Sequence, residues 1–280
     1  MSINLYQEKL KWSGYEKKLD ICEKIEVIPI LQARNSKQVL YKSAIALKLA
    51  SVFQERAIDI ATELAKYCGE IVNTEMKKER LNFQVEVVSS GMINFKIEDL
   101  SIAKWLNDLS YLPLNCQKQK LQVAPSETRN LFPIQYSHAR CCSLLRMGEG
   151  DRLITLTPTT SEIYSQFLFI ETPHSIPWQK LNGELQFLDN AEYELIAQIA
   201  FTLDRIYCFS ESKKPVNWEK VAETLSLAFQ TFYRECRIWG KVKIETPRLA
   251  QARLGLVLVT QSVLRFLLEK RLGEKALTEL

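Results

Sequence analysis

The 280-residue sequence has few of the residues that metal sites, disulfide frameworks and nucleotide-binding loops require. It contains only two histidines, His138 and His174. Its seven cysteines form no Cys-x-x-Cys pair and have no histidine partner at metal-ligand spacing. They are therefore expected to be reduced core thiols. No Gly-x-x-x-x-Gly-Lys or Gly-x-Gly-x-x-Gly motif is present for binding phosphates. We therefore expect neither a metal nor a nucleotide cofactor.

Glycine and proline are also scarce, with nine of each, whereas 46% of the residues are hydrophobic. This composition predicts a globular, mainly α-helical protein with enough apolar side chains for one or two cores. The apolar stretch at residues 254–259 is too short to cross a bilayer, and residues 1–11 lack the apolar run of a signal peptide. A cytoplasmic location without membrane contact is expected.

The charge is mildly basic overall, with a formal net value of +4, and it is unevenly distributed. Residues 234–275 contain ten Lys or Arg and four Asp or Glu, whereas residues 171–204 contain six acidic residues and one lysine. The positive charge of the C-terminal part fits an anionic partner, but it equally fits ordinary solvated helix faces.

Hydrophobic spacing predicts a small α/β domain followed by a helical one. Residues 43–68 favour two short amphipathic helices with a polar break at residues 54–56. Residues 81–97 alternate around turn residues 89–91 as in a hairpin, and a helix begins near residue 98. Residues 148–188 are predicted to be irregular or short-stranded. Further helices are expected at residues 133–147, 191–208, 217–239 and 247–271, the last ended by Gly273.

Residues 110–131 are rich in Pro, Asn, Gln, Lys and Ser, as is typical of a linker. The predicted fold class is therefore mainly α with a small α/β N-terminal domain and a C-terminal α-helical bundle. The expected boundaries are an α/β domain at residues 1–109, the linker at 110–131 and the bundle at 132–280.

Three stretches of the bundle resemble arginyl-tRNA synthetases. Residues 134–146 read Ile-Gln-Tyr-Ser-His-Ala-Arg-Cys-Cys-Ser-Leu-Leu-Arg, similar to the Gln-Tyr-Ala-His-Ala-Arg helix that opens their anticodon-binding bundle. Residues 227–238, with Ala-Phe-Gln-Thr-Phe-Tyr and Cys-Arg-Ile, resemble a second helix of that bundle. Residues 252–264 begin Ala-Arg-Leu-Gly-Leu-Val and resemble its closing helix.

The N-terminal part resembles the same family. Residues 44–61 are similar to its N-terminal helices, and Ser-Gly-Met-Ile-Asn-Phe at residues 90–95 is similar to its Pro-Gly-Phe-Ile-Asn-Phe hairpin. In that family this domain touches the dihydrouridine loop of tRNA. The resemblance implies a DALR-type anticodon-binding domain and a partner that is tRNA or a tRNA-like RNA. The implied RNA-binding residues are Asn94, Tyr136, Arg140, Arg146, Tyr233, Arg237 and Arg253.

Five of these residues also have a structural interpretation. Arg140 and Arg146 can reach a phosphate or an unstacked base, or they can pair with the acidic stretch at residues 171–194. Tyr233 with Arg237 can form a stacking platform, although aromatic residues at helical spacing are as often core residues. Asn94 can recognise a flipped nucleotide or be a surface asparagine. His138 has no nucleophile near it in the sequence and is expected to be a packing histidine, so no catalytic residue is assigned.

The resemblance leaves no room for the synthetase's catalytic domain. Only 22 residues separate Leu109 from Phe132, whereas a nucleotide-binding βαβ fold needs well over about a hundred. The family's His-Ile-Gly-His signature and its Lys-Met-Ser-Lys-Ser loop are also not found. We therefore expect a non-catalytic tRNA- or RNA-binding protein. The alternative is a scaffold that uses the same domains to bind another protein without RNA.

Overall fold

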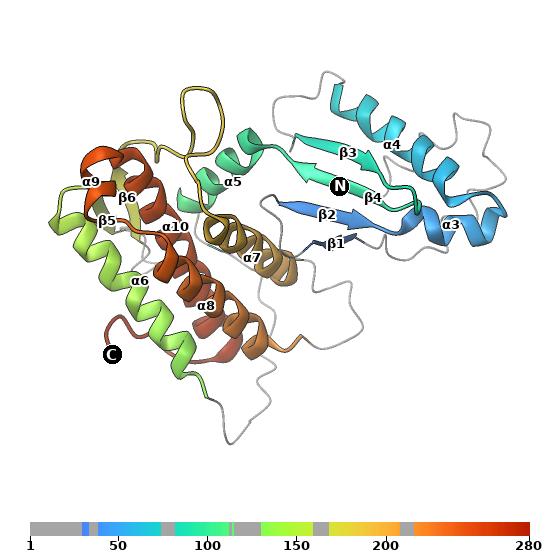
Figure 1. Ribbon diagram of the computed structural model, residues 1–280. Helices are drawn as coiled ribbons and strands as arrows, with labels where there is room; N and C mark the ends of the chain where they lie inside the picture. The colour runs from blue at the N-terminus through green and yellow to red at the C-terminus, as the bar shows by residue number, and fades with distance from the viewer. Residues whose placement is uncertain are drawn as a thin grey trace. The chain divides into compact units, whose positions relative to one another are not determined.

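The computed structural model describes residues 30–33, 39–73, 82–111, 114, 130–158, 168–207 and 216–280 (Figure 1). By its contacts the chain divides into two compact units. One comprises residues 1–33 and 40–97, and the other comprises residues 34–39 and 98–280. The first contains a small sheet with two helices and the second is mostly helical, which confirms the predicted fold class.

The first unit contains a four-stranded antiparallel sheet in the order β1-β2-β4-β3. Its elements are β1 (Ile30–Gln32), β2 (Leu40–Ser43), α3 (Ile45–Phe53), α4 (Ala57–Asn73), β3 (Phe83–Val87) and β4 (Ile93–Ile97). The predicted hairpin is β3–β4, and the two predicted helices are α3 and α4. The sequence pattern does not predict β1 and β2, because three or four residues are too few to show an alternation.

The core of the first unit forms between the helices and one face of the sheet. Ile93 is buried with Ala46 and Leu49 from α3 and with residues of α4, and alternate residues of β3 and β4 pack against them. Gly91 at the hairpin turn has φ +85, and a Cβ there would lie 2.6 Å from the Cβ of Ala57. Both the backbone conformation and the close approach to α4 therefore require glycine.

The second unit is a helical bundle with a small hairpin. Its elements are α5 (Asp99–Tyr111), α6 (Phe132–Gly150), β5 (Thr155–Pro158), β6 (Leu168–Thr172), α7 (Asn190–Tyr207), α8 (Trp218–Glu235), α9 (Lys241–Glu245), α10 (Pro247–Phe266) and the π-helical η4 (Leu267–Leu272). The predicted helices are confirmed as α6, α7, α8 and α10 with η4, which ends at Gly273. Helix α8 ends four residues earlier than predicted, and the chain then turns into α9.

Helix α10 is the centre of the bundle. Every residue from 252 to 264 is buried, and α5, α6, α7 and α8 all contact it. The helix with its extension, Pro247–Leu272, is long and apolar enough to cross a membrane, but 89% of its most apolar window is buried. A helix that is apolar all round is typical of one covered by other helices on every side. Its composition therefore reflects its place in the core.

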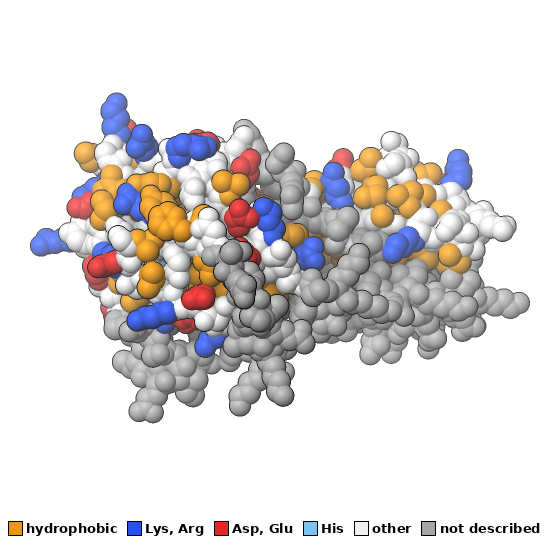
Figure 2. Space-filling model, turned by 90° about the horizontal axis from the view of Figure 1, so that it is seen from below, with side chains coloured by type: hydrophobic (Ala, Val, Ile, Leu, Met, Phe, Trp, Pro, Cys, Tyr) orange, Lys and Arg blue, Asp and Glu red, His pale blue; other side chains and the backbone are white. Residues whose placement is uncertain are grey.

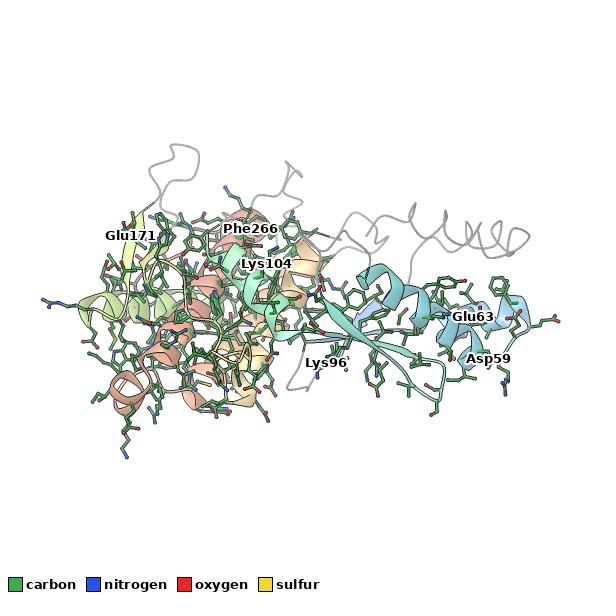
Figure 3. All side chains as sticks on the ribbon, turned by 90° about the horizontal axis from the view of Figure 1, so that it is seen from above. Asp59, Glu63, Lys96, Lys104, Glu171 and Phe266 are labelled. Carbon is green, nitrogen blue, oxygen red and sulfur yellow. The ribbon has the colours of Figure 1, made fainter. Side chains whose placement is uncertain are left out.

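Helix α5 belongs to the second unit, although the sequence placed it in the N-terminal domain. Its first residue, Asp99, accepts a hydrogen bond from the backbone N–H of Leu185 at 3.1 Å. At its other end the Tyr111 hydroxyl donates to the carbonyl of His174 at 2.8 Å. Figure 3 shows α5, marked by Lys104, beside α10, whose last residue Phe266 is also labelled.

The contacts thus change units after Ile97, whereas the predicted boundary lies after residue 109. The predicted linker at residues 110–131 lies outside the described residues, except for residues 110, 111, 114, 130 and 131. Whether residues 1–109 and 132–280 fold as separate domains stays a prediction.

Candidate nucleic-acid interface

Helix α6 presents two rows of side chains with different surroundings. Residues spaced by three, four or eleven fall on the same side of an α-helix. The first set, which we call the aromatic row, consists of Phe132, Tyr136 and Arg140. The second set, which we call the strap row, consists of Gln135, His138 and Arg146. The aromatic row is partly open to solvent, whereas the strap row contacts the segment that follows η4.

The aromatic row begins with two exposed rings. Phe132 is 64% exposed and Tyr136 is 42% exposed. The rings stack with an interplanar angle of 26° and centroids 6.2 Å apart. Sequence reasoning singled out Tyr136 but missed Phe132, although its four-residue spacing from Tyr136 was visible. Solvent-exposed stacked rings offer a surface on which an unpaired base can stack.

Arg140 connects this row to α8. Its guanidinium donates to the hydroxyl of Tyr233, and its Cζ lies 4.6 Å from the centroid of that ring. Beside this pair, the Gln230 amide donates to the hydroxyl of Ser137 at 3.2 Å. We call these four residues, Ser137, Arg140, Gln230 and Tyr233, the α6–α8 seam. The structure therefore brings together Arg140 and Tyr233, two predicted RNA-binding residues that come from different helical motifs of the sequence.

The seam is held in place from the core side. The ring of Tyr233 stacks on buried Phe229, with centroids 6.4 Å apart and an interplanar angle of 17°. Arg140 is only partly buried, and its Nε–H has no hydrogen-bond partner among the described residues. The pairing with Tyr233 therefore orients the guanidinium without using all of its donors.

Arg146 lies on the strap row. One terminal nitrogen is 3.4 Å from a carboxylate oxygen of Glu279 and donates to the carbonyl of Thr278 at 3.4 Å. Neither Arg140 nor Arg146 pairs with residues 171–194 in the contacts of the described chain. The alternative considered for these two arginines, pairing with that acidic stretch, therefore does not match the contacts that they make.

Arg253, by contrast, does pair with the acidic stretch at residues 171–194. Its side chain is only 4% exposed, its Nε donates to Glu192 at 2.6 Å and a terminal nitrogen donates to Asp189 at 2.8 Å. The remaining terminal nitrogen donates to the backbone carbonyl of Arg237. All three guanidinium nitrogens are therefore engaged inside the bundle. We correct the sequence-based assignment and remove Arg253 from the candidate RNA-binding residues.

The carboxylates around Arg253 also form the group that most resembles a metal site in the described chain. Ligand atoms of Asp189, Glu192 and Cys236 lie within 4.8 Å of one another. The guanidinium of Arg253 already forms ion pairs with both carboxylates. Burial raises the pKa of the Cys236 thiol to about 12, and the Glu192 carboxylate adds to this shift. A protonated thiol and two ion-paired carboxylates are poor metal ligands, so we assign no metal there.

His138 is a packing histidine, as predicted. It is 1% exposed, its Nδ1 lies 2.8 Å from the carbonyl of Leu277, and its Nε2 lies 2.9 Å from the amide nitrogen of Gln261. A neutral ring that donates from Nδ1 and accepts at Nε2 satisfies both contacts. Burial lowers the pKa of His138, so the uncharged form is favoured.

The cysteines that the structure describes are Cys68, Cys141, Cys142 and Cys236; all four are buried, as expected of core cysteines, and none of these four forms a disulfide.

The two remaining candidates lie elsewhere. The side chain of Arg237 is exposed just beyond the end of α8. Asn94 lies on β4 in the first unit, and its amide nitrogen is 3.5 Å from a carboxylate oxygen of Glu86 on the neighbouring strand. Lys96, labelled in Figure 3, is two residues further on the same strand and on the same face of the sheet. The structure thus places Asn94 beside Glu86 and on the same face as Lys96 within the first unit.

Figure 2 shows hydrophobic side chains gathered on the surface of the second unit, with Lys and Arg and also Asp and Glu side chains among and around them. A mixture of exposed rings, aliphatic groups and cations differs from an ordinary solvated helix face. The exposed rings of Phe132 and Tyr136 beside Arg140 suit a ligand with flat apolar parts and negative charges.

Comparison with known proteins identifies the domain that contains the seam. Residues 134–280 match the family model described as the DALR anticodon binding domain. The arginine-tRNA ligase of Synechococcus sp. (strain JA-3-3Ab) is 32% identical over 216 residues, covering 74% of this chain and 32% of the relative. The arginine-tRNA ligase of Moorella thermoacetica is 30% identical over 148 residues, covering 52% of this chain and 22% of the relative. No solved structure matches.

The chain thus aligns with about a third or less of the length of these ligases. The matched domain nevertheless includes more than half of the 280 residues and contains α6, α7, α8 and α10 together with the seam. The resemblance drawn from the three helical motifs is confirmed: the chain belongs to the family of proteins that carry the DALR anticodon binding domain.

Proposed function

We propose that this protein binds tRNA or a tRNA-like RNA through the aromatic row and the α6–α8 seam, and that it does not aminoacylate that RNA. The observation that carries the proposal is the continuity of exposed rings and guanidinium on α6 and α8. Phe132 and Tyr136 are open to solvent, and Arg140 follows them on the same side of the helix, fixed against Tyr233. The anticodon-binding description of the matched domain supports the same ligand.

The physical case rests on stacking and charge. Stacking of an unpaired base on an aromatic side chain contributes about 1–3 kcal/mol per base. A partly exposed guanidinium beside the rings can bind the phosphate that links two such bases. Exposed Arg237, just beyond the end of α8, is also included in the proposed surface. Arg146 is included as well, although the strap contacts it. Asn94 stays a separate proposal for the first unit.

The non-catalytic part of the proposal rests on the sequence and on the extent of the match. The ligases matched here are about three times longer than the aligned region or more. Between the two resembling parts only residues 110–131 intervene, and no adenylate-forming signature is present. We propose that the protein works in the cytoplasm on RNA supplied by other enzymes.

The test is a comparison of two exposed tyrosines. Tyr136→Ala should weaken binding of a tRNA transcript by about fivefold or more, as expected from the loss of one stacking contact. Tyr207→Ala, which removes a ring that is 52% exposed on α7, should leave the affinity within about twofold. Fluorescence anisotropy at constant salt measures both.

A plain RNA duplex provides the second arm of the test, because stacking needs an unpaired base. Tyr136→Ala should change duplex affinity little. Equal losses for tRNA and duplex would contradict stacking by Tyr136. If tRNA binds the wild-type protein no better than a polyanion does at the same salt, the RNA proposal fails.

A second candidate function is protein binding by the same scaffold. Several large aliphatic side chains of the bundle are strongly exposed: Leu181 (102%), Ile244 (81%), Leu188 (64%) and Leu227 (63%). Exposed apolar side chains in number are typical of interaction surfaces. Failure of the RNA test combined with co-purification of one stoichiometric protein partner would favour this function.

A further inference from the structure

The strap, residues 275–279, binds α6 mainly through its backbone. In Figure 1 the red end of the chain runs beside α6. The Gln135 amide donates to the carbonyl of Lys275 at 2.8 Å and accepts from the N–H of Leu277 at 3.0 Å. It thus bridges the two sides of Ala276, which is buried. His138 contacts the carbonyl of Leu277. These contacts fix the first half of the strap.

The far end of the strap is held differently. Arg146 contacts the carbonyl of Thr278 and the carboxylate of Glu279, both at 3.4 Å. The two side chains are 49% and 80% exposed, so this ion pair lies in water. An exposed ion pair is weak and opens readily. The strap therefore has a firmly bound half on Gln135 and His138 and a loosely bound acidic end on Arg146.

We infer that the acidic end of the strap competes with RNA for Arg146, so that Glu279 occupies the place of a phosphate until RNA displaces it. This inference rests on the proposed function. A guanidinium binds carboxylate and phosphate oxygens with the same donors, so both cannot use them at once. The strap row is next to the aromatic row on α6, which places Arg146 on the helix that the proposed RNA surface uses.

The geometry limits how large this effect is. Only residues 278 and 279 need to move, because the hydrogen bonds of Gln135 and His138 hold residues 275–277 independently of Arg146. The strap therefore lowers RNA affinity without abolishing it. The inhibition should equal the strength of one exposed ion pair, which corresponds to about a two- to fivefold change in affinity.

The experiment measures tRNA affinity by fluorescence anisotropy for Glu279→Gln and for Glu274→Gln, each with Arg146 present and in the Arg146→Gln background. Glu274 is an exposed acid immediately before the strap, so its change alters the net charge equally. We expect Glu279→Gln to bind about two- to fivefold more tightly than Glu274→Gln when Arg146 is present. In the Arg146→Gln background this difference should disappear.

Equal affinities of the two glutamine variants with Arg146 present would overturn the inference, since the gain would then be general charge. The inference would also be overturned if Glu279→Gln still bound tRNA more tightly than Glu274→Gln in the Arg146→Gln background. If none of the proteins binds tRNA above a polyanion control, the proposed function itself is wrong. If the wild type binds and the two variants are equal, only the strap inference is wrong.

Discussion

Arg253 allows the bundle to bury a carboxylate. Glu192 is fully buried, and it accepts hydrogen bonds from the N–H groups of Leu188 and Asp189 just before α7. A buried carboxylate needs a compensating cation, and Arg253 provides it from α10. The same guanidinium reaches the carbonyl of Arg237 beyond α8, so one side chain connects three segments of the bundle.

Replacement of Arg253 by methionine should therefore be strongly destabilising. It leaves Glu192 buried without a cation, and the loss of one partner of a buried ion pair costs about 3–5 kcal/mol of unfolding free energy. Urea unfolding followed by circular dichroism measures the change. Arg248→Met on the same helix is the matched control, because Arg248 is exposed. A loss no greater than that of the control would show that Arg253 does not stabilise the bundle.

His138 should make stability depend on pH. Its pKa is lowered from 6.5 mainly by burial, so the unfolded chain binds a proton at a pH where the folded chain does not. The contribution of neutral His138 to the free energy of unfolding is fully present above pH 6.5 and is lost as the pH falls below that value. The melting temperature of the wild type should fall between pH 7 and pH 5.5, and the melting temperature of His138→Gln should fall less steeply.

The second histidine is the control for this experiment. His174 is exposed, and His174→Gln should keep the slope of the wild type between pH 7 and pH 5.5. The depressed pKa values of Asp151 and Glu184 affect stability only near pH 4, outside this window. A slope that is unchanged in His138→Gln would contradict the assignment.

At the scale of elements, α5 covers α10. Five of its residues are buried, namely Ser101, Ile102, Ala103, Leu106 and Ser110. Its ends are fastened to the segment between β6 and α7 through Asp99 and Tyr111. The sequence placed this helix with the preceding hairpin because it follows that hairpin directly. Its partners instead come from more than sixty residues later in the chain.

This packing predicts how truncation affects the bundle. A fragment of residues 98–280 should unfold cooperatively, whereas residues 112–280 should unfold at a lower urea concentration and bind a hydrophobic dye, because one side of α10 is uncovered. Helix content by circular dichroism and dye fluorescence distinguish the two. Identical unfolding midpoints would show that α5 is not part of the bundle's core.

For the whole molecule, the proposed RNA binding should depend on the salt concentration. Affinity for tRNA should fall linearly with salt on logarithmic axes, because bound phosphates release counterions. Arg140→Gln should reduce the slope by about one. Lys220→Gln should not, since Lys220 lies about 20 Å before Tyr233 along α8. Equal slopes for all three proteins would exclude a phosphate contact by Arg140.

The proposed lack of catalysis is tested directly. The protein should support no arginine-dependent exchange between pyrophosphate and ATP, and ATP should not bind in a saturable manner, because the sequence contains no phosphate-binding motif. An active arginyl-tRNA synthetase measured in parallel provides the positive control. Exchange above background would overturn the non-catalytic proposal.

Local spacing was sufficient to predict most helices and the β3–β4 hairpin. Helical and strand periods are written in consecutive residues, so α3, α4, α6, α7, α8 and α10 could be found without any tertiary contact. The same spacing placed Tyr136 and Arg140 on one side of α6. Strands β1 and β2 could not be found, because strands of three and four residues depend on their neighbours for pairing.

The sequence by itself determined the family, the helical bundle and the presence of aromatic and basic residues on its first helix. Only the tertiary structure decided which of its arginines can contact a ligand and which are engaged inside the bundle. Arg140, Arg146 and Arg253 look equivalent in helical sequence, but Arg253 meets Glu192 from 61 residues away, and Arg146 meets Glu279 from the far end of the chain. The energy of a charge depends on its burial and its neighbours, and both are set by the packing of distant segments.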